Sequence, residues 1–231
     1  MSDPQEAEKR AAGEAAASLV QDGMAVGLGT GSTAYWAIEA LGRRTKSGLS
    51  IVAIPTSERS GAQARGLGIK LITFAERQRL DLTIDGADEI AVGPLDLIKG
   101  LGGALLREKI VAAASDRLII VADQRKLVEQ LGATPIPVEV VPFGWETTRA
   151  RIEALGGRPV LRMGSDGAPF RTDGGNLILD CAFGLIDQPA ALETRLRGTL
   201  GVIGTGLFIG MAEAAFVADA NGVKQLKRAA P

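Results

Sequence analysis

The sequence predicts an α/β protein, with a mostly parallel open sheet flanked by helices and a small inserted α+β domain of the ferredoxin-like type. Short apolar runs alternate with helical patterns over the first 130 residues, as expected when crossover helices join parallel strands. Prolines and shorter strand-like runs replace this alternation near residue 131. With 46% hydrophobic residues, the 231-residue chain can bury a sizeable core. We therefore predict a main domain at 1–130 plus 205–231 and a small domain at 131–204.

The first predicted elements lead into a glycine-rich loop. An Ala- and Glu-rich segment at 5–21 is typical of a helix, and the apolar run 24–28 indicates a buried strand. Gly29-Thr30-Gly31-Ser32-Thr33 follows and opens a helical pattern that reaches residue 41. Further main-domain strands are expected at 50–54, 68–72, 80–84 and 117–122, with one helix capped by 55–57 and ending at 65, and another over 102–114. Parallel strands share one carboxyl edge, where open α/β sheets bind ligands.

The predicted small domain combines two helices with short strands. Its strands are expected at 138–141, 158–162, 169–172, 176–181 and 201–204, and its helices at 145–155 and 190–197. The apolar run 215–218 then returns to the main sheet. The basic segment 224–228 is short, and we expect a solvated helix end or tail there.

Charge and cysteine content narrow the class of protein. The formal net charge is −1, and the 26 basic and 27 acidic residues are interspersed, which argues against a nucleic-acid-binding surface. Cys181 is the only cysteine, so no intramolecular disulfide can form and a reducing compartment fits. The acidic N-terminus is unlike a signal peptide, and no apolar run is long enough to cross a bilayer. We expect a cytoplasmic protein that binds neither nucleic acid nor membrane.

The chain contains no histidine. Ser-His-Asp and Cys-His mechanisms, and metal sites built on histidine, are therefore excluded. A general base in this protein must be a carboxylate, a lysine, a tyrosine or a cysteine.

The loop 29–33 is a candidate phosphate-binding site. Its glycines let the backbone approach an anion, and the N-terminus of the following helix offers unpaired N–H groups. The hydroxyls of Thr30, Ser32 and Thr33 add donors. The loop lacks the Gly-Lys-Ser/Thr of a Walker A motif, and it has Ser32-Thr33 where a dinucleotide fingerprint has its last glycine. The alternative is a glycine turn capped by Ser32 or Thr33, without a ligand.

Two acids and a lysine follow the predicted strand 80–84. Asp85 and Asp88 lie on a glycine turn at the ligand-binding edge of the sheet, and Lys99 enters a second glycine-rich loop. We expect Lys99 to bind substrate hydroxyls or an oxyanion. The alternatives are a polar turn in which Asp88 or Glu89 is solvated, and a solvated loop lysine.

Glu108 is predicted to lie on the apolar face of the helix over 102–114. It shares that face with Leu101, Leu105 and Ala112 at helical spacing. A carboxylate on such a stripe must be paired or must lie in a cleft, and a cleft would raise its pKa toward the range of a general base. A structural salt bridge with Arg107, Lys109 or Lys99 is the alternative.

Four linked motifs resemble ribose-5-phosphate isomerase of the A type. They are the 29–33 loop, Asp85-Gly86-Ala87-Asp88-Glu89, Lys99-Gly-x-Gly-x-Ala and Arg107-Glu108-Lys109, in that order and spacing. The likeness continues through 137–140, 155–158 and 176–180, so it spans nearly the whole chain.

This resemblance implies an aldose–ketose isomerase of the pentose phosphate pathway that interconverts D-ribose 5-phosphate and D-ribulose 5-phosphate through an enediolate, without metal or cofactor. Glu108 would be the base, Lys99 would stabilise the oxyanion, and Asp85, supported by Asp88, would assist ring opening and hydroxyl proton transfers. Substrate contacts are implied for Thr30, Gly31, Ser32, Thr33, Asp85, Gly86, Ala87, Asp88, Lys99, Gly100, Leu101, Gly102, Lys126 and Lys9. The resemblance also implies a homodimer or a tetramer.

The chain departs from the family pattern at two positions. Leu101 stands where the family typically has glycine, which we expect to alter the loop. Thr205 stands where we expect histidine, at a position that we expect to be peripheral to the site.

Two other classes of protein fit the sequence less well. A nicotinamide dehydrogenase needs a third fingerprint glycine and an acid after the second strand, but that strand ends Ile54-Pro55-Thr56-Ser57. A non-enzymatic sugar-phosphate sensor would lack the base and would usually carry a helix-turn-helix, for which we expect no room before the phosphate loop.

Overall fold

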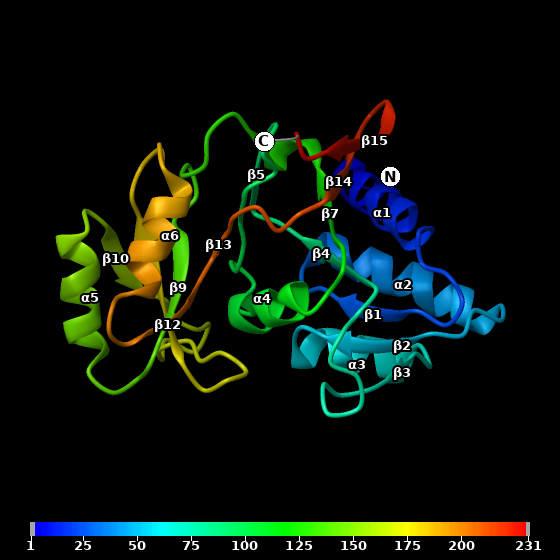
Figure 1. The fold of residues 1–231 in the computed structure, drawn as a ribbon, viewed down its shortest axis with the longest axis horizontal. Helices are drawn as coiled ribbons and strands as arrows, with labels where there is room; N and C mark the ends of the chain where they lie inside the picture. Colours follow the sequence, from blue (N-terminus) through cyan, green and yellow to red (C-terminus); the bar gives the residue numbers. More distant parts are fainter. Residues whose placement is uncertain (1–2, 230–231) are drawn as a thin grey trace.

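A seven-stranded sheet in the order β15-β14-β7-β4-β1-β2-β3 forms the centre of the larger part of the protein (Figure 1). The computed structural model describes residues 3–229, so residues 1, 2, 230 and 231 of the predicted main domain lie outside it. Neighbouring strands of this sheet are parallel, except for β14 and β15 at one edge. The mostly parallel open sheet that the sequence predicts is confirmed.

The strands of this sheet, apart from β15, match the predicted apolar runs closely. They are β1 (Ala25–Leu28), β2 (Val52–Pro55), β3 (Lys70–Leu71), β4 (Leu82–Gly86), β7 (Leu118–Asp123), β14 (Ala214–Asp219) and β15 (Gly222–Lys227). The helices around it are α1 (Pro4–Ala17), α2 (Ser32–Lys46), α3 (Glu58–Gly66) and α4 (Leu105–Ala113). Ser57 caps α3 as predicted, and its hydroxyl accepts a hydrogen bond from the N–H of Ser60.

Alternation along the strands assigns side chains to the two faces of the sheet. Ile84 of β4 packs into the apolar cluster that includes α1 and α2, together with every second residue of β7. Successive residues of a strand point to opposite faces, so Asp85 must point away from α1 and α2. That second face carries α4, which contacts β4 and brings Glu108.

The region 136–205 forms a separate antiparallel sheet in the order β10-β11-β9-β12. Its elements are β9 (Ile136–Val140), α5 (Trp145–Ala154), β10 (Arg158–Leu161), β11 (Leu177–Ala182), α6 (Pro189–Arg197) and β12 (Val202–Thr205). This strand–helix–strand–strand–helix–strand order is the ferredoxin-like arrangement that the sequence predicts. We call it the antiparallel unit. Figure 1 shows α4 between this unit and the main sheet, and α4 contacts β9 and β12 as well as β4.

A third small sheet, which the sequence analysis did not predict, joins the two parts. Its order is β13-β6-β5-β8, from β5 (Glu89–Ala91), β6 (Leu97–Ile98), β8 (Leu127–Val128) and β13 (Leu207–Phe208). A short 3-10 helix, Gln124–Lys126, precedes β8. The strands are two or three residues long, which is too short for a periodicity of two to be recognised.

Three sequence predictions are wrong in detail. Helix α4 begins at Leu105 rather than at 102, because Gly103 has φ of +83° and cannot be helical. No strand forms over 169–172, where Pro169 has no N–H to donate and makes only an isolated bridge with Met163. The basic segment 224–228 belongs mainly to the edge strand β15, which a turn at Ala220-Asn221 pairs with β14.

Candidate active site

Asp85 lies at the end of β4, where its carboxylate reaches the glycine-rich loop. It is fully buried, and its Oδ1 accepts hydrogen bonds from the N–H groups of Thr30 (2.9 Å) and Gly86 (2.8 Å). A Cβ at Gly29 would lie 2.2 Å from that oxygen, so only glycine lets the loop approach it. Gly29 therefore allows the backbone of the 29–33 loop to approach and hydrogen-bond the Asp85 carboxylate on the neighbouring strand β4.

Lys99 is a buried cation between two carboxylates. Its side chain is 2% exposed, and its Nζ lies 3.1 Å from Oδ2 of Asp85 and 3.5 Å from Oε2 of Glu108. The ammonium also donates to the carbonyl of Gly86. Burying a lone cation is unfavourable, so these oxygens hold it in place. The solvated loop lysine considered above is wrong.

Glu108 lies on the buried face of α4 and is only 3% exposed. Leu105 and Ala112 share that face as predicted, whereas Leu101, also predicted to share it, precedes the helix and is exposed. Its ion pair is with Lys99, whereas Lys109 pairs with Glu193 of α6. Lys99 Nζ is 3.1 Å from Oδ2 of Asp85 and 3.5 Å from Oε2 of Glu108, and among residues 3–229 neither oxygen has another donor. Glu108 borders a cavity, so its Oε2 is suited to a substrate hydroxyl or to a proton.

The surroundings shift the protonation of all three groups. Burial and, after it, the charge of Asp85 raise the pKa of Glu108, Lys99 opposes them, and the result is a pKa of about 8. Burial also raises the pKa of Asp85, against the charge of Lys99. For Lys99, burial acts to lower the pKa, but the charges of Asp85 and Glu108 outweigh it and raise the pKa. At neutral pH the site therefore contains a firmly charged ammonium and a carboxyl group able to exchange a proton.

A cavity of about 90 Å³ brings most of the predicted residues together. It is lined by Thr30, Gly31, Ser32, Thr33, Gly86, Ala87, Asp88, Lys99, Gly100, Gly102, Glu108 and Lys126. These residues come from the ends of β1, β4 and β7 and from α4 and its preceding loop. The carboxyl edge of the parallel sheet is thus where the cavity lies, as the sequence analysis expects.

The phosphate-loop candidate opens α2 without a side-chain cap. Gly31 is the N-cap residue with φ of +127°, and no side chain in the described chain caps this helix. The N–H groups of its first turn therefore remain available to an anion at the positive end of the helix dipole. The hydroxyl of Thr30 instead bonds those of Thr56 and Ser57.

Four residues singled out from the sequence do not line the cavity. Asp85 is fully buried behind it and contacts the lining residues Thr30, Gly86 and Lys99. Lys9 pairs with Glu6 at 2.8 Å on α1. The side chain of Leu101 is 47% exposed, and Leu101 has no positive φ, so the loop accepts it without strain. Its N–H donates to Oδ2 of Asp88 at 3.0 Å. Thr205 is off the cavity but not peripheral to the fold, because it is fully buried and its hydroxyl donates to Glu193.

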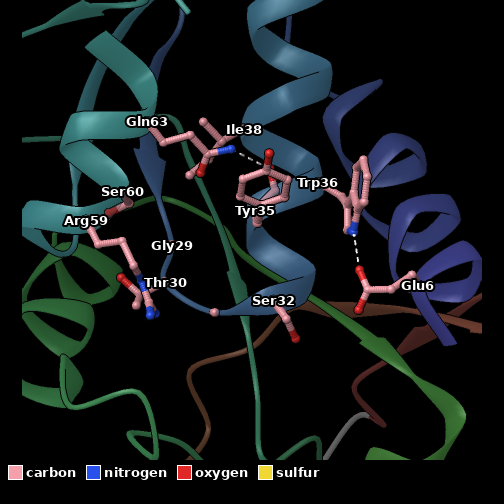
Figure 2. A pocket seen from close by; sticks show the side chains of 11 residues that line it. Glu6, Gly29, Thr30, Ser32, Tyr35, Trp36, Ile38, Arg59, Ser60 and Gln63 are labelled. Carbon is pink, nitrogen blue, oxygen red and sulfur yellow. Dashed lines mark hydrogen bonds between the residues drawn. The ribbon is translucent and has the colours of Figure 1, made fainter. Parts of the chain in front are cut away.

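A second, larger cavity of about 340 Å³ lies on the other side of the glycine loop. Figure 2 shows Tyr35 and Trp36 of α2 and Arg59 of α3 around it. Its one carboxylate, Glu6, already accepts hydrogen bonds from Trp36 and Lys9. It lacks the paired acids and lysine, so we place the chemistry in the smaller cavity.

Arg162 is a residue of the site that the sequence analysis missed. From the end of the antiparallel unit it donates to the carbonyls of Gly100 and Leu101, both at 3.0 Å, and it pairs with Asp180. It therefore fixes the loop after Lys99 from outside. Nothing in the local sequence signals this contact, because the partners are 62 positions apart.

Within residues 3–229, no cluster of three or more acid or cysteine side chains is arranged to hold a metal ion. That same part of the chain has no helix of the length and apolarity that spanning a membrane requires.

Comparison with known proteins identifies the family. Residues 52–222 match the family described as Ribose 5-phosphate isomerase A (phosphoriboisomerase A). A ribose-5-phosphate isomerase A from Synechococcus sp. (strain JA-3-3Ab) is 57% identical over 222 residues, which cover 95% of this chain and 96% of that protein. One from Bacillus mycoides (strain KBAB4) is 53% identical over 218 residues, covering 94% and 98%.

Solved structures agree over almost the full length. Ribose 5-phosphate isomerase A from Methanocaldococcus jannaschii superposes with a TM-score of 0.93 at 38% identity, covering 96% of this chain and 99% of that one. A D-ribose-5-phosphate isomerase in complex with phospho-erythronic acid gives a TM-score of 0.94 at 37% identity, covering 97% and 99%. With the fold, the motifs and the sequence match in agreement, the chain belongs to the ribose-5-phosphate isomerase A family and is an isomerase of that family.

Proposed function

We propose that this enzyme interconverts D-ribose 5-phosphate and D-ribulose 5-phosphate through an enediolate, with Glu108 as a carboxylate general base and no metal or cofactor. The observation that carries the proposal is the cluster of Glu108, Lys99 and Asp85. It places a buried carboxyl group, whose pKa is raised to about 8, 3.5 Å from a buried ammonium. Moving a proton next to a carbonyl needs these two functions together.

The proton transfer follows from the charges. In the open-chain aldose, Glu108 takes the proton from C2, and the electron pair moves to the C1 oxygen to form the enediolate. Glu108 then returns a proton to C1, while a proton passes from O2 to O1, which gives the ketose. Negative charge thus leaves the Glu108 carboxylate and appears on a substrate oxygen, and we place both beside Lys99. A cation fixed in advance stabilises that change without reorganisation.

Asp85 and Asp88 would handle hydroxyl protons. Burial raises the pKa of Asp85, so this carboxyl can release or accept a proton during ring opening and during exchange between O1 and O2. Asp88 lines the cavity and holds the N–H of Leu101. We assign it a supporting role.

The phosphate group would bind at the N-terminus of α2. The uncapped N–H groups after Gly31 and the side chains of Ser32, Thr33 and Lys126 line that end of the cavity. The phospho-erythronic acid held by a relative supports this class of ligand. It is a phosphorylated sugar acid.

The test is a rate measurement with D-ribose 5-phosphate in the presence of a chelator. Glu108→Gln is expected to fold and to bind substrate but to lose most turnover, whereas Glu153→Gln, the same change on the exposed helix α5, is expected to behave as wild type. Arabinose 5-phosphate, the C2 epimer, should compete without being turned over at a similar rate. Near-normal turnover by Glu108→Gln would refute the base assignment.

The enediolate has its own test. During many turnovers in D₂O, a carboxyl group that carries the proton exchanges it with solvent, so deuterium is expected at C1 of the ketose and C2 of the aldose. An equilibrated mixture without deuterium would contradict the proposal. We further propose a cytoplasmic homodimer or tetramer that contacts no nucleic acid or membrane, to be tested by light scattering and cell fractionation.

A further inference from the structure

Lys109 forms a partly buried polar link between the catalytic helix α4 and the antiparallel unit. Its Nζ donates to Oε1 of Glu193 at 2.8 Å, to the carbonyl of Leu207 at 2.7 Å and to the hydroxyl of Thr205 at 3.3 Å. The three hydrogens of a lysine ammonium are thereby all used. The side chains of Lys109 and Glu193 are only 18% and 14% exposed.

The segment 205–208, which receives Lys109, also holds Lys99. The N–H of Lys99 donates to the carbonyl of Gly206 at 2.8 Å, and β13 pairs with β6, the strand that ends just before Lys99. The ring of Phe208 lies 5.4 Å from Nζ of Lys99 and 4.9 Å from Nζ of Lys109. One strand is thus attached to the cation of the site on one side and to the catalytic helix on the other.

We propose that Lys109 and Glu193 are positioning residues that set the separation of Glu108 from Lys99. Glu108 and Lys109 are adjacent on α4, so anchoring Lys109 to segment 205–208 fixes the helix that carries the base relative to the strand that carries the cation. Glu193, from α6, holds both Lys109 and Thr205 and closes the link. The antiparallel unit thereby contributes to catalysis without touching the cavity. This inference rests on the proposed role of Glu108.

The link is largely shielded from water, with side chains 18% and 14% exposed, unlike the surface ion pairs of this protein. Arg149 and Glu153 of α5, for example, are 48% and 47% exposed and one helical turn apart. Such exposed pairs contribute little. Removing one partner of a buried pair leaves the other without compensation, whereas replacing both by apolar groups is tolerated.

The experiment compares Lys109→Met, Glu193→Leu and the double variant with wild type in ribose 5-phosphate turnover. We expect each single variant to lower kcat by about ten- to hundredfold, the loss expected from a misplacement of about 1 Å, with KM changed less than about twofold. The double variant should be no slower than the slower single variant, because both changes break one link. Glu193→Gln keeps the shape of the side chain and one acceptor oxygen for Lys109, although its NH2 group cannot accept from Thr205, so it should recover part of kcat.

The pH profile separates positioning from loss of stability. Asp85, Asp88 and Lys99 surround Glu108, and of these only Lys99 favours its ionised form. Loosening the Glu108–Lys99 contact should therefore move the midpoint of the kcat profile to higher pH. Leu196→Ala is the matched control, because Leu196 is fully buried on the same α6 helix but leaves the link intact. It should lower Tm and leave kcat and the midpoint unchanged in the folded protein.

The outcomes distinguish the two proposals. If Glu108→Gln is inactive while Lys109→Met and Glu193→Leu retain wild-type kcat and pH midpoint, the positioning inference is wrong and the base assignment stands. If Leu196→Ala lowers kcat as much as Lys109→Met and Glu193→Leu do, loss of stability explains all three effects, and the inference is also overturned. If Glu108→Gln retains wild-type turnover, the base assignment fails and the inference fails with it.

Discussion

The rate of ribose 5-phosphate isomerisation is expected to rise with pH, with a midpoint near pH 8. Burial, reinforced by the charge of Asp85, raises the pKa of Glu108 to about 8, and only the ionised form can take a proton from carbon. Below that pH the ionised fraction falls tenfold per unit, so kcat/KM should fall with a slope of one. The shift from 4.5 corresponds to about 5 kcal/mol between the two protonation states.

Two substitutions should move this midpoint in opposite directions. Lys99→Met removes a positive charge 3.5 Å from Glu108, which at an effective dielectric constant of about 20 is an attraction of about 5 kcal/mol. Allowing for relaxation, the midpoint should rise by roughly one to three pH units. Asp85→Asn removes a negative charge that disfavours ionisation, so the midpoint should fall. Both variants will also have a lower maximal rate. The midpoint of the pH–rate profile, rather than its maximal rate, is therefore the quantity to compare.

The assay is the initial rate of ribulose 5-phosphate formation from pH 5 to 10 at constant ionic strength. Carboxyl-carbon NMR of the free enzyme gives an independent titration of Glu108, and the absence of histidine removes imidazole titration from this range. Glu153→Gln is the control for loss of one surface carboxylate. A midpoint near 4.5, or a midpoint that neither Lys99→Met nor Asp85→Asn moves, would refute the electrostatic reasoning.

Three further predictions concern stability and substrate binding. Because the pKa of Glu108 is raised in the folded protein, the folded state binds more protons between about pH 4.5 and 8, and the free energy of unfolding should fall as pH rises through that window. Glu108→Gln should remove this loss, so denaturant unfolding at pH 9 should show that the variant is more stable than wild type. Equal stability of the two proteins at pH 9 would contradict this prediction. Thr33→Ala should mainly raise KM by weakening the phosphate contact, and an unchanged KM would remove Thr33 from the site. Arg162→Met should raise KM and accelerate proteolysis of the loop 100–103, because the carbonyls of Gly100 and Leu101 lose their donor, whereas Arg149→Met on the surface should change neither.

The positions of the main site residues could be predicted from the sequence because their causes are local. Asp85 directly follows an apolar run that can only be a buried strand, and open parallel sheets bind ligands at that edge. Glu108 interrupts an apolar helical stripe, so its burial followed from spacing alone. The loop 29–33 was recognisable because glycines and hydroxyls directly precede a helix. These patterns involve neighbours within about one or two turns of the chain.

The contacts that hold the site involve residues far apart in the sequence, and no pattern predicts them. Lys109 and Glu193 are 84 positions apart, and each alone reads as an ordinary surface charge. Lys9 was assigned to phosphate from the family resemblance, but folding pairs it with Glu6 on its own helix. The hairpin of β14 and β15 turns at Ala220-Asn221, and the Asn221 and Gly222 beside that turn are a local turn signal.

The sequence by itself determined the class of fold, the family, and which acids and lysine could perform proton transfer in a chain without histidine. Only the tertiary structure decided the state of those groups. Glu108 has a raised pKa because α4 packs it against β4, next to Asp85 and away from water, and Lys99 remains charged because two carboxylates converge on it from different elements. Desolvation and charge–charge interaction depend on distance in space, and distance in space between remote segments is set by packing rather than by order along the chain.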